Sequence, residues 1–242
     1  MKKLIVNADD FGMCEGVSLG IIKCHTDGVL TSTTLMTNMP FAPHAVEMAR
    51  MYPKLGLGIH LVATCGTPVI PGKKSFTDEH GNFKKLKDYP NGEVKMNPDE
   101  LYLEWKAQIE LFIRMVGKKP THIDSHHHVH LLPGNVDIAI CLAKEYDIPM
   151  RQETDLGLGY EVATLMRGFG NNISIDYFEK DLTIDTTQEL MCHPAFIDYH
   201  LYQNSSYCNE RVFEMKFIRS QEFRNWINDH KIKLINYSDI TK

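Results

Sequence analysis

The sequence lacks the features typical of membrane proteins, of proteins from oxidising compartments and of nucleic-acid binders. No segment approaches the ~18 apolar residues of a membrane span, and the apolar run near residue 5 is too short for a signal peptide. The six cysteines include no C-x-x-C pair, which favours a reduced, cytoplasmic protein. Lysine and arginine total 26 against 31 acidic residues, so no basic excess favours a nucleic-acid partner.

Internal repeats and low-complexity segments are also absent. The chain has 242 residues, of which 43% are hydrophobic and 24% charged. A chain of this size can bury a substantial core without disulfides or a structural metal. Because the length is ordinary for one α/β barrel, we predict a single domain over residues 1–242.

Strand-like and helix-like segments alternate along the chain. The expected strands are residues 4–6, 31–37, 55–61, 122–130, 148–151, 188–193 and 232–235, and the expected helices are 16–24, 41–52, 98–116, 136–146, 210–218 and 221–230. This alternation implies a parallel sheet, either doubly wound or barrel-like. Residues 62–95 interrupt it with glycines, prolines and charges, which is typical of a functional insertion or mobile loop. Residues 152–184 follow no clear pattern.

Five of the twelve histidines lie within nine residues. Imidazole is the commonest protein metal ligand and is suited to proton transfer near neutral pH. If this segment is an extended strand, alternate side chains share one face. That face carries His122, Asp124, His126, His128 and His130. A polar face at a strand end indicates a site rather than a core.

Other ionisable residues also stand at the carboxyl ends of predicted strands, where α/β proteins form their sites. These residues are Asp9, Asp10, His60, Arg151 and His193. Each has a plain structural alternative: a helix-capping acidic pair, a hydrogen-bonded core histidine or a surface salt bridge. Strand alternation would turn the two aspartates to different sides, so that one could bind a metal and the other act as a base.

His60 is preceded on its own face of the strand by Gly56 and Gly58. Two glycines on one face leave room for a neighbouring strand or a ligand. For a single histidine, a hydrogen-bonded place in the core remains the simpler interpretation.

Four sequence blocks, in this order, resemble the YdjC family, which includes the chitooligosaccharide deacetylases. They are Leu4 to Gly12, Thr31 to Thr34, Gly58 to Leu61 and Pro120 to His130. The resemblance extends over the whole length, and the last block is highly specific. It implies a distorted (β/α) barrel of the polysaccharide-deacetylase type, with seven parallel strands. It also implies a homodimer that hydrolyses the N-acetyl group of acetylated amino sugars such as chitooligosaccharides.

The resemblance further implies one divalent metal, Mg²⁺ by family likeness. The implied ligands are Asp10, His60 and His126. The wider superfamily usually carries both histidine ligands in one His-x-x-x-His motif, so His128 and His130 remain possible substitutes for His126. A carboxylate with two imidazoles also suits Zn²⁺ and other transition metals.

Catalytic roles follow from the same resemblance. Asp9 would be the general base, Arg151 would orient it, and His193 would be the general acid. Two alternatives stay open: a metal-dependent phosphoesterase on a similar barrel, and a non-catalytic metal-binding or sugar-binding protein. Residues 62–95 and 152–184 would wall the groove for a small N-acetylated sugar. There, three tyrosines could stack on sugar rings: Tyr160, Tyr199 and Tyr202.

Overall fold

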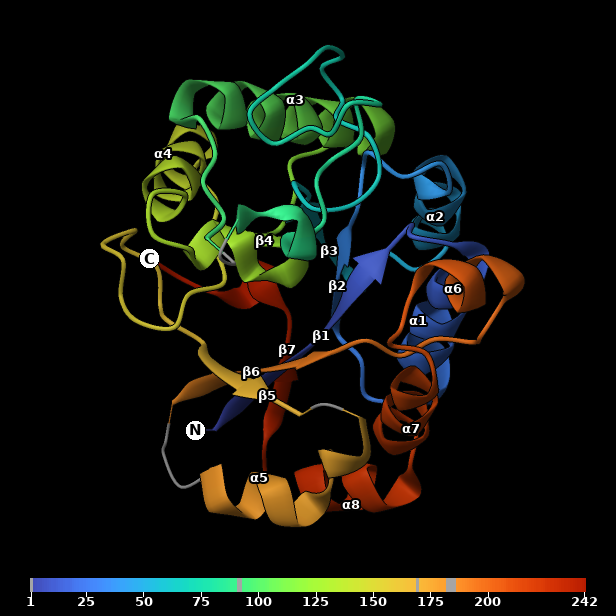
Figure 1. Cartoon of the computed structure of the whole chain (residues 1–242). Helices are drawn as coiled ribbons and strands as arrows, with labels where there is room; N and C mark the ends of the chain where they lie inside the picture. The colour runs from blue at the N-terminus through green and yellow to red at the C-terminus, as the bar shows by residue number, and fades with distance from the viewer. Residues whose placement is uncertain (1, 91–92, 169, 182–185) are drawn as a thin grey trace.

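A seven-stranded parallel sheet, curled into a half-barrel, forms the centre of the molecule, and helices cover its outside (Figure 1). The computed structural model describes residues 2–90, 93–168, 170–181 and 186–242, so parts of both irregular stretches lie outside the described residues. The strand order is β4-β3-β2-β1-β6-β5, with β7 paired to β1. This confirms the predicted distorted α/β barrel.

The bounds of the regular elements mostly match the expected ones. The strands are β1 Lys3–Phe11, β2 Ser32–Leu35, β3 Gly56–Leu61, β4 Ile123–Ser125, β5 Thr164–Arg167, β6 Thr187–Cys192 and β7 Lys233–Ile235. The helices are α1 Glu15–Asp27, α2 Ala42–Arg50, α3 Pro98–Val116, α4 Val136–Tyr146, α5 Ile175–Asp181, α6 Tyr199–Asn204, α7 Asn209–Ile218 and α8 Gln221–Asp229. None of the described helices is both long and apolar enough to cross a bilayer.

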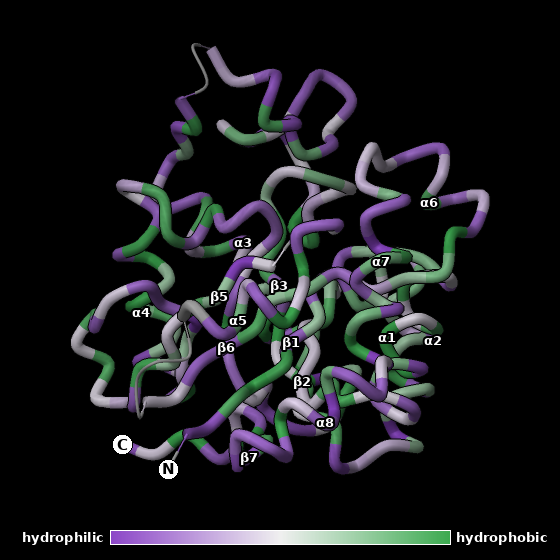
Figure 2. The backbone as a smooth tube through the Cα atoms, turned by 90° about the horizontal axis from the view of Figure 1, so that it is seen from below, coloured by the Kyte–Doolittle hydropathy of each residue, from purple (hydrophilic) through white to green (hydrophobic). Residues whose placement is uncertain are grey.

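Strand β1 organises the sheet because it pairs with three others. Its first half pairs with β7, its second half with β2, and most of its length with β6. Leu4 and Val6 join the core shared with the helices, whereas Ile5 joins a smaller cluster with Ile235 and Tyr237. Figure 2 shows the hydrophobic part of β1 in the middle of the molecule. Because side chains alternate along a strand, Asp9 points to the same face of β1 as Ile5.

Helix α3 begins where the sequence predicts. The side chain of Asn97 accepts a hydrogen bond from the Glu100 amide, and Pro98 occupies the first turn. The helix ends at Gly117, whose φ of +84° is the left-handed conformation that glycine adopts readily.

The predicted histidine strand is wrong beyond Ser125. Strand β3 ends at Leu61, which is paired with Ser125, so the ladder cannot continue. Residues His126–Leu131 form a 3-10 turn in which His127 and His128 have left-handed φ values of 57° and 54°. The five polar side chains therefore do not share one face.

The expected strand 148–151 is reduced to a single bridge between Ile123 and Met150. The Arg151 amide still donates to the Ile123 carbonyl at 2.8 Å, so the segment lies along β4 and delivers Arg151 to the sheet edge. Strand β5 lies instead within the stretch that showed no pattern. Only one of its four residues is buried, which explains the absence of a hydrophobic signal.

Candidate active site

A cavity of about 920 Å³ opens at the carboxyl ends of the strands. Five of the predicted site residues line it: Asp9, Asp10, His60, His126 and His193. They come from β1, β3, the turn after β4 and the residue after β6. The structure thus brings together residues that are up to 184 positions apart, at the edge where parallel sheets place their sites.

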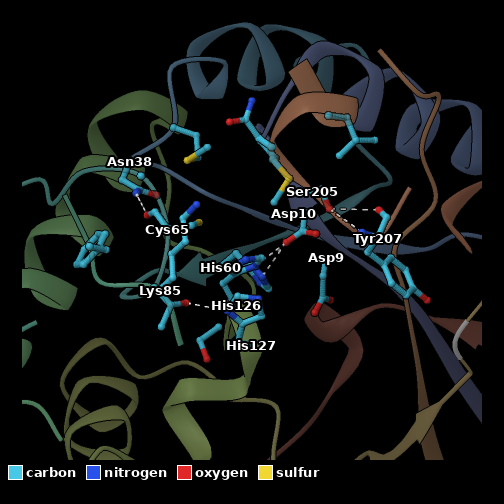
Figure 3. A pocket seen from close by; sticks show the side chains of 18 of the residues that line it. Asp9, Asp10, Asn38, His60, Cys65, Lys85, His126, His127, Ser205 and Tyr207 are labelled. Atoms are coloured by element: carbon cyan, nitrogen blue, oxygen red, sulfur yellow. Dashed lines mark hydrogen bonds and ion pairs between the residues drawn. The ribbon is translucent and has the colours of Figure 1, made fainter. Parts of the chain in front are cut away.

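Asp10 and His60, both buried, and His126, which is partly exposed, form a cluster within this cavity (Figure 3). Oδ1 of Asp10 is 2.9 Å from Nδ1 of His126 and 3.3 Å from Nε2 of His60. One ligand atom from each residue lies within 4.8 Å of the others. The predicted ligand set is therefore assembled in space, although its members come from three different parts of the chain.

Asp10 reaches this cluster through an unusual backbone conformation. Its φ is +71°, and the pairing of β1 with β2 shifts register between Ala8 and Phe11. The expectation that Asp9 and Asp10 face different sides is wrong, because this bulge lets both carboxylates line the same cavity. Strained non-glycine residues of this kind concentrate at functional sites.

His60 is oriented by a carboxylate that the sequence analysis did not assign. Nδ1 of His60 is 2.7 Å from Oδ1 of Asp124, whose other oxygen accepts a hydrogen bond from Thr34 at 3.0 Å. Burial would lower the pKa of His60, but Asp124 and Asp10 together raise it to about 9. The sequence analysis noted Asp124 only as a member of the histidine-rich segment. Its place beside His60 follows from the register between β3 and β4.

This arrangement fits a divalent metal. Because His60 uses Nδ1 to donate to Asp124, a neutral ring presents an unprotonated Nε2 to Oδ1 of Asp10. Two acceptors facing each other need a proton or a cation between them. One carboxylate and two imidazoles, with a carboxylate behind one imidazole, form a common donor set for a divalent metal.

Asp9 lies beside this cluster and is gripped by Arg151. Nη1 and Nη2 of Arg151 donate to the two oxygens of Asp9 at 2.8 and 2.7 Å. Oε1 of Glu189 accepts from the other edge of the guanidinium at 3.0 and 2.6 Å. Burial would raise the pKa of Asp9, but Arg151 outweighs this and holds the pKa well below its usual range. Asp9 is thus ionised and fixed in orientation.

A second group of possible metal ligands consists of Asp9, His60 and Asp124. The positively charged guanidinium of Arg151 already lies against its two carboxylates. Nη1 of Arg151 is 2.8 Å from Oδ2 of Asp9 and 3.1 Å from Oδ2 of Asp124. The guanidinium occupies the place between these two carboxylates where a second metal would bind. The geometry therefore favours one metal position over two.

His193 follows β6 directly and reaches the cavity with 17% of its side chain exposed. Its backbone amide donates to Oε2 of Glu214, an oxygen that is also 3.7 Å from the ring Nδ1. Glu214 is fully buried in α7 and also accepts from the Gly170 amide at 2.9 Å and from the Tyr207 hydroxyl. Sequence reasoning missed Glu214, because nothing in the pattern of α7 distinguishes it from a surface glutamate.

The remaining members of the histidine cluster have separate roles. His122 stacks on Tyr237, with ring centroids 3.7 Å apart. Both ring nitrogens of His130 are used, by the Ser125 hydroxyl at 2.5 Å and the Arg151 carbonyl at 3.1 Å. His128 lines the cavity without joining either group of potential ligands among the described residues. This geometry favours His126 as the ligand over its two possible substitutes.

None of the three tyrosines expected to stack on sugars is among the described residues that line the cavity. Tyr199 and Tyr202 are 79% and 67% exposed, because α6 turns His200, Leu201 and Asn204 toward the cavity instead. The hydroxyl of Tyr160 donates to Asp147 elsewhere on the surface. Part of the insertion does wall the cavity, through residues that include Asn82, Phe83 and Lys85.

Fold and site together define a distorted α/β barrel with a candidate metal centre at the carboxyl ends of its strands. The model of the family described as "YdjC-like protein" matches residues 3–229, and the chain belongs to this family. A protein of Brevibacillus brevis named carbohydrate deacetylase is 40% identical, with 98% of this chain and 99% of that protein covered.

Two solved structures resemble the fold. A proposed cellobiose-phosphate cleavage protein of Enterococcus faecalis is 34% identical, with a TM-score of 0.88 over 98% of this chain and 97% of the other. A family 4 carbohydrate esterase from Streptomyces lividans, determined in complex with acetate, has a TM-score of 0.51 at 7% identity. It covers 96% of this chain and 91% of the esterase, and at that identity the likeness concerns the fold alone.

Proposed function

We propose that this protein is a metal-dependent carbohydrate deacetylase that hydrolyses the N-acetyl group of acetylated amino sugars or short oligosaccharides such as chitooligosaccharides. The observation that carries the proposal is the convergence of Asp10, His60 and His126 in the cavity that also holds Asp9 and His193. The name of the Brevibacillus relative supports the same activity.

One divalent metal held by Asp10, His60 and His126 would polarise the acetyl carbonyl and acidify the attacking water. Family resemblance implies Mg²⁺. The two imidazoles suit Zn²⁺ or another transition metal better, because magnesium prefers oxygen ligands.

Asp9 is the proposed general base. Its carboxylate is ionised at neutral pH and has lone pairs left after its two bonds with Arg151, so it can accept the proton of the attacking water. Arg151 positions this carboxylate rather than reacting. The same ion pair keeps the base in one orientation as the water approaches.

His193 is the proposed general acid, which protonates the departing amine nitrogen. Without that proton the leaving group would be an amide anion, and general acid catalysis is typically worth on the order of 10²–10⁴-fold. Glu214 holds the backbone and ring of His193 from behind. The acid and the base thus stand on the same cavity as the ligand cluster.

The outer cavity supports a sugar as the substrate. Its walls carry amide, hydroxyl and charged groups that suit a molecule rich in hydroxyls; they include Asn38, Asn82, Lys85, Asn204 and Ser205. At about 920 Å³ the cavity is large for a single sugar unit, which supports short oligosaccharides. We further propose a single catalytic domain in a reduced, cytoplasmic setting, as the chain length and the cysteines predict, and a homodimer, as the family resemblance implies.

A phosphoesterase is the alternative, and the name of the Enterococcus relative makes a sugar phosphate the relevant substrate to test. Arg151 argues against the two-metal form of that chemistry, because it already fills the second position. Purified protein is assayed for acetate release from N-acetylated chitooligosaccharides and for phosphate release from cellobiose phosphate, each with and without chelator. We expect chelator-sensitive acetate release only. Phosphate as the main product would favour the alternative, and neither product would favour a binding protein.

The role of His193 is tested by His193→Ala. We expect kcat for acetate release to fall on the order of 10²–10⁴-fold, while metal content stays at the wild-type level. His44→Ala, which removes an exposed histidine of α2, serves as the control and should retain full activity. Wild-type turnover in His193→Ala would remove this residue from the mechanism.

A further inference from the structure

A second buried arginine, on α7, contacts one of the proposed metal ligands. Arg211 is 3% exposed, and its Nη2 donates to Oδ2 of Asp10 at 2.7 Å. Its Nε donates to the Tyr207 carbonyl at 2.8 Å, and its guanidinium lies 5.6 Å from the centre of the Tyr207 ring. These contacts hold the guanidinium in one place, at the oxygen of Asp10 that the imidazoles do not contact.

The two oxygens of Asp10 are thereby divided between two different kinds of partner. Oδ1 faces His60 and His126, whereas Oδ2 is taken by Arg211. A cation in the ligand cluster would therefore meet only Oδ1. Arg211 limits Asp10 to a single ligand atom and prevents it from chelating through both oxygens.

Arg211 also changes the charge that an incoming cation meets. The imidazoles of His60 and His126 are neutral when they bind a metal, so Asp10 is the one negative ligand in the cluster. A guanidinium is always charged, and this one cancels the charge of Asp10 at 2.7 Å. The next acids, Asp9 and Asp124, share the single guanidinium of Arg151. Arg211 thus lowers the negative charge that a divalent cation meets in the ligand cluster.

A purely stabilising role is a poor account of this arginine. Buried ion pairs contribute little net stability, because both partners must lose their hydration. Within the described part of the chain, Nη1 of Arg211 is buried without an acceptor, which adds a further desolvation cost.

We propose that Arg211 is a positioning residue of the metal centre that holds Asp10 to one oxygen and weakens the binding of every divalent cation. This inference rests on the metal site in the proposed function. Arg211 weakens the electrostatic attraction of the site for every divalent ion. Ions that bond strongly to imidazole nitrogen are still retained, whereas Mg²⁺, which depends on anionic oxygens, is not. The arrangement therefore favours a transition metal as the resident ion.

The test measures metal affinity rather than activity. Metal-free wild type, Arg211→Gln, Arg211→Met and Arg211→Lys are titrated with Zn²⁺ against a chromophoric chelator, and with Mg²⁺ by calorimetry. Loss of a positive charge this close should tighten Zn²⁺ binding by about tenfold or more in both neutral variants. Arg211→Lys retains the charge and should stay within about threefold of wild type. The control is Arg219→Gln, which removes a half-buried arginine at the end of α7 that pairs with Asp27 instead.

Circular dichroism establishes that each variant is folded. The proposal is overturned if a folded neutral variant binds Zn²⁺ no more tightly than wild type does. It is also overturned if neither wild type nor the neutral variants bind Zn²⁺. Wild type that binds Mg²⁺ as tightly as Zn²⁺ would also overturn it. The outcome is separable from the proposed activity: tighter binding in protein that releases no acetate would sustain the role of Arg211 and refute the deacetylase. Acetate release with unchanged Zn²⁺ affinities would support the deacetylase and refute the role of Arg211.

Discussion

The buried charges around Asp9 and Asp10 occur in ion pairs and chains rather than singly. Glu189, Arg151 and Asp9 form one chain, and Arg211 with Asp10 forms a separate pair. An isolated buried charge costs several kcal/mol, so each of these residues depends on its partner to remain ionised. At the scale of the residue, these ion pairs fix the positions of the charged groups inside the barrel.

Glu214 provides a residue-scale prediction on stability. Its carboxylate accepts hydrogen bonds from two backbone amides and from the Tyr207 hydroxyl. Glu214→Gln replaces one acceptor oxygen by an amide that donates, so we expect a loss of about 1–3 kcal/mol in the free energy of unfolding at pH 7. Denaturant unfolding measures this loss, with Glu222→Gln, at an exposed residue of α8, as the control.

The same variant has a pH signature. Burial would raise the pKa of Glu214, but its contacts with His193 and Tyr207 hold the pKa below the ordinary value of 4.5. A lowered pKa means that the stability due to this carboxylate is present above pH 4.5 and is lost as the pH falls further. The difference between wild type and Glu214→Gln should therefore shrink below that pH. A constant difference down to the acid transition would contradict the assignment.

At the scale of the element, α3 fastens the insertion that walls the cavity. The two carboxylate oxygens of Glu104 accept from the Val69 and Ile70 amides at 2.8 and 2.9 Å. One turn later, Gln108 bonds both the amide and the carbonyl of Val62 at 2.8 Å. A spacing of four residues places both side chains on one helical face, so the helix pins a segment that has little regular structure of its own.

Glu104→Gln should release part of this segment. We expect a loss of about 1–3 kcal/mol, because Glu104 is 1% exposed and one backbone amide would lose its acceptor. Hydrogen exchange at Val69 and Ile70 should accelerate, and KM for the sugar should rise. Glu100→Gln is the matched control, since Glu100 lies one turn earlier, is less buried and accepts from the Ser75 amide. Equal effects of the two variants would show that burial of Glu104 is not decisive.

At the scale of the whole molecule, the two ends of the chain are joined within one sheet and one polar chain. β1 pairs with β7, and the Tyr237 hydroxyl donates to Glu189 at 2.5 Å, which leads through Arg151 to Asp9. The carboxyl-terminal turn at Tyr237–Asp239 is thereby connected to Asp9, the proposed general base. Such connections favour unfolding as one unit.

We accordingly expect a single cooperative unfolding transition. The two tryptophans, Trp105 in α3 and Trp226 in α8, report on separate parts of the molecule. Fluorescence of Trp105→Phe and Trp226→Phe, followed with circular dichroism, should give coincident transitions within each variant. Added Zn²⁺ should raise the midpoint, because a ligand that binds the folded state stabilises it. Transitions that differ between the two probes would indicate two domains.

Regular elements with a strong local signal were predictable. Asn97 and Pro98 mark the start of α3, and α4 has the predicted bounds. The sequence also predicted that Gly58 leaves room for a neighbouring strand. The ring of His122 fills that room, and a Cβ on Gly58 would lie 2.4 Å from it. In contrast, β5 is a mostly exposed edge strand and α6 has six residues, so neither produces a periodic pattern.

The sequence by itself determined the alternation of strands and helices, the family, and the set of residues that could carry the chemistry. These depend on local patterns and on short motifs that survive without three-dimensional context. Only the tertiary structure decided which of them meet. Sheet register sets Asp124 behind His60, a bulge turns Asp10 into the cavity, and α7 brings Arg211 and Glu214 from across the barrel. Contacts between distant segments follow from how strands pair and helices pack, and local sequence does not specify that.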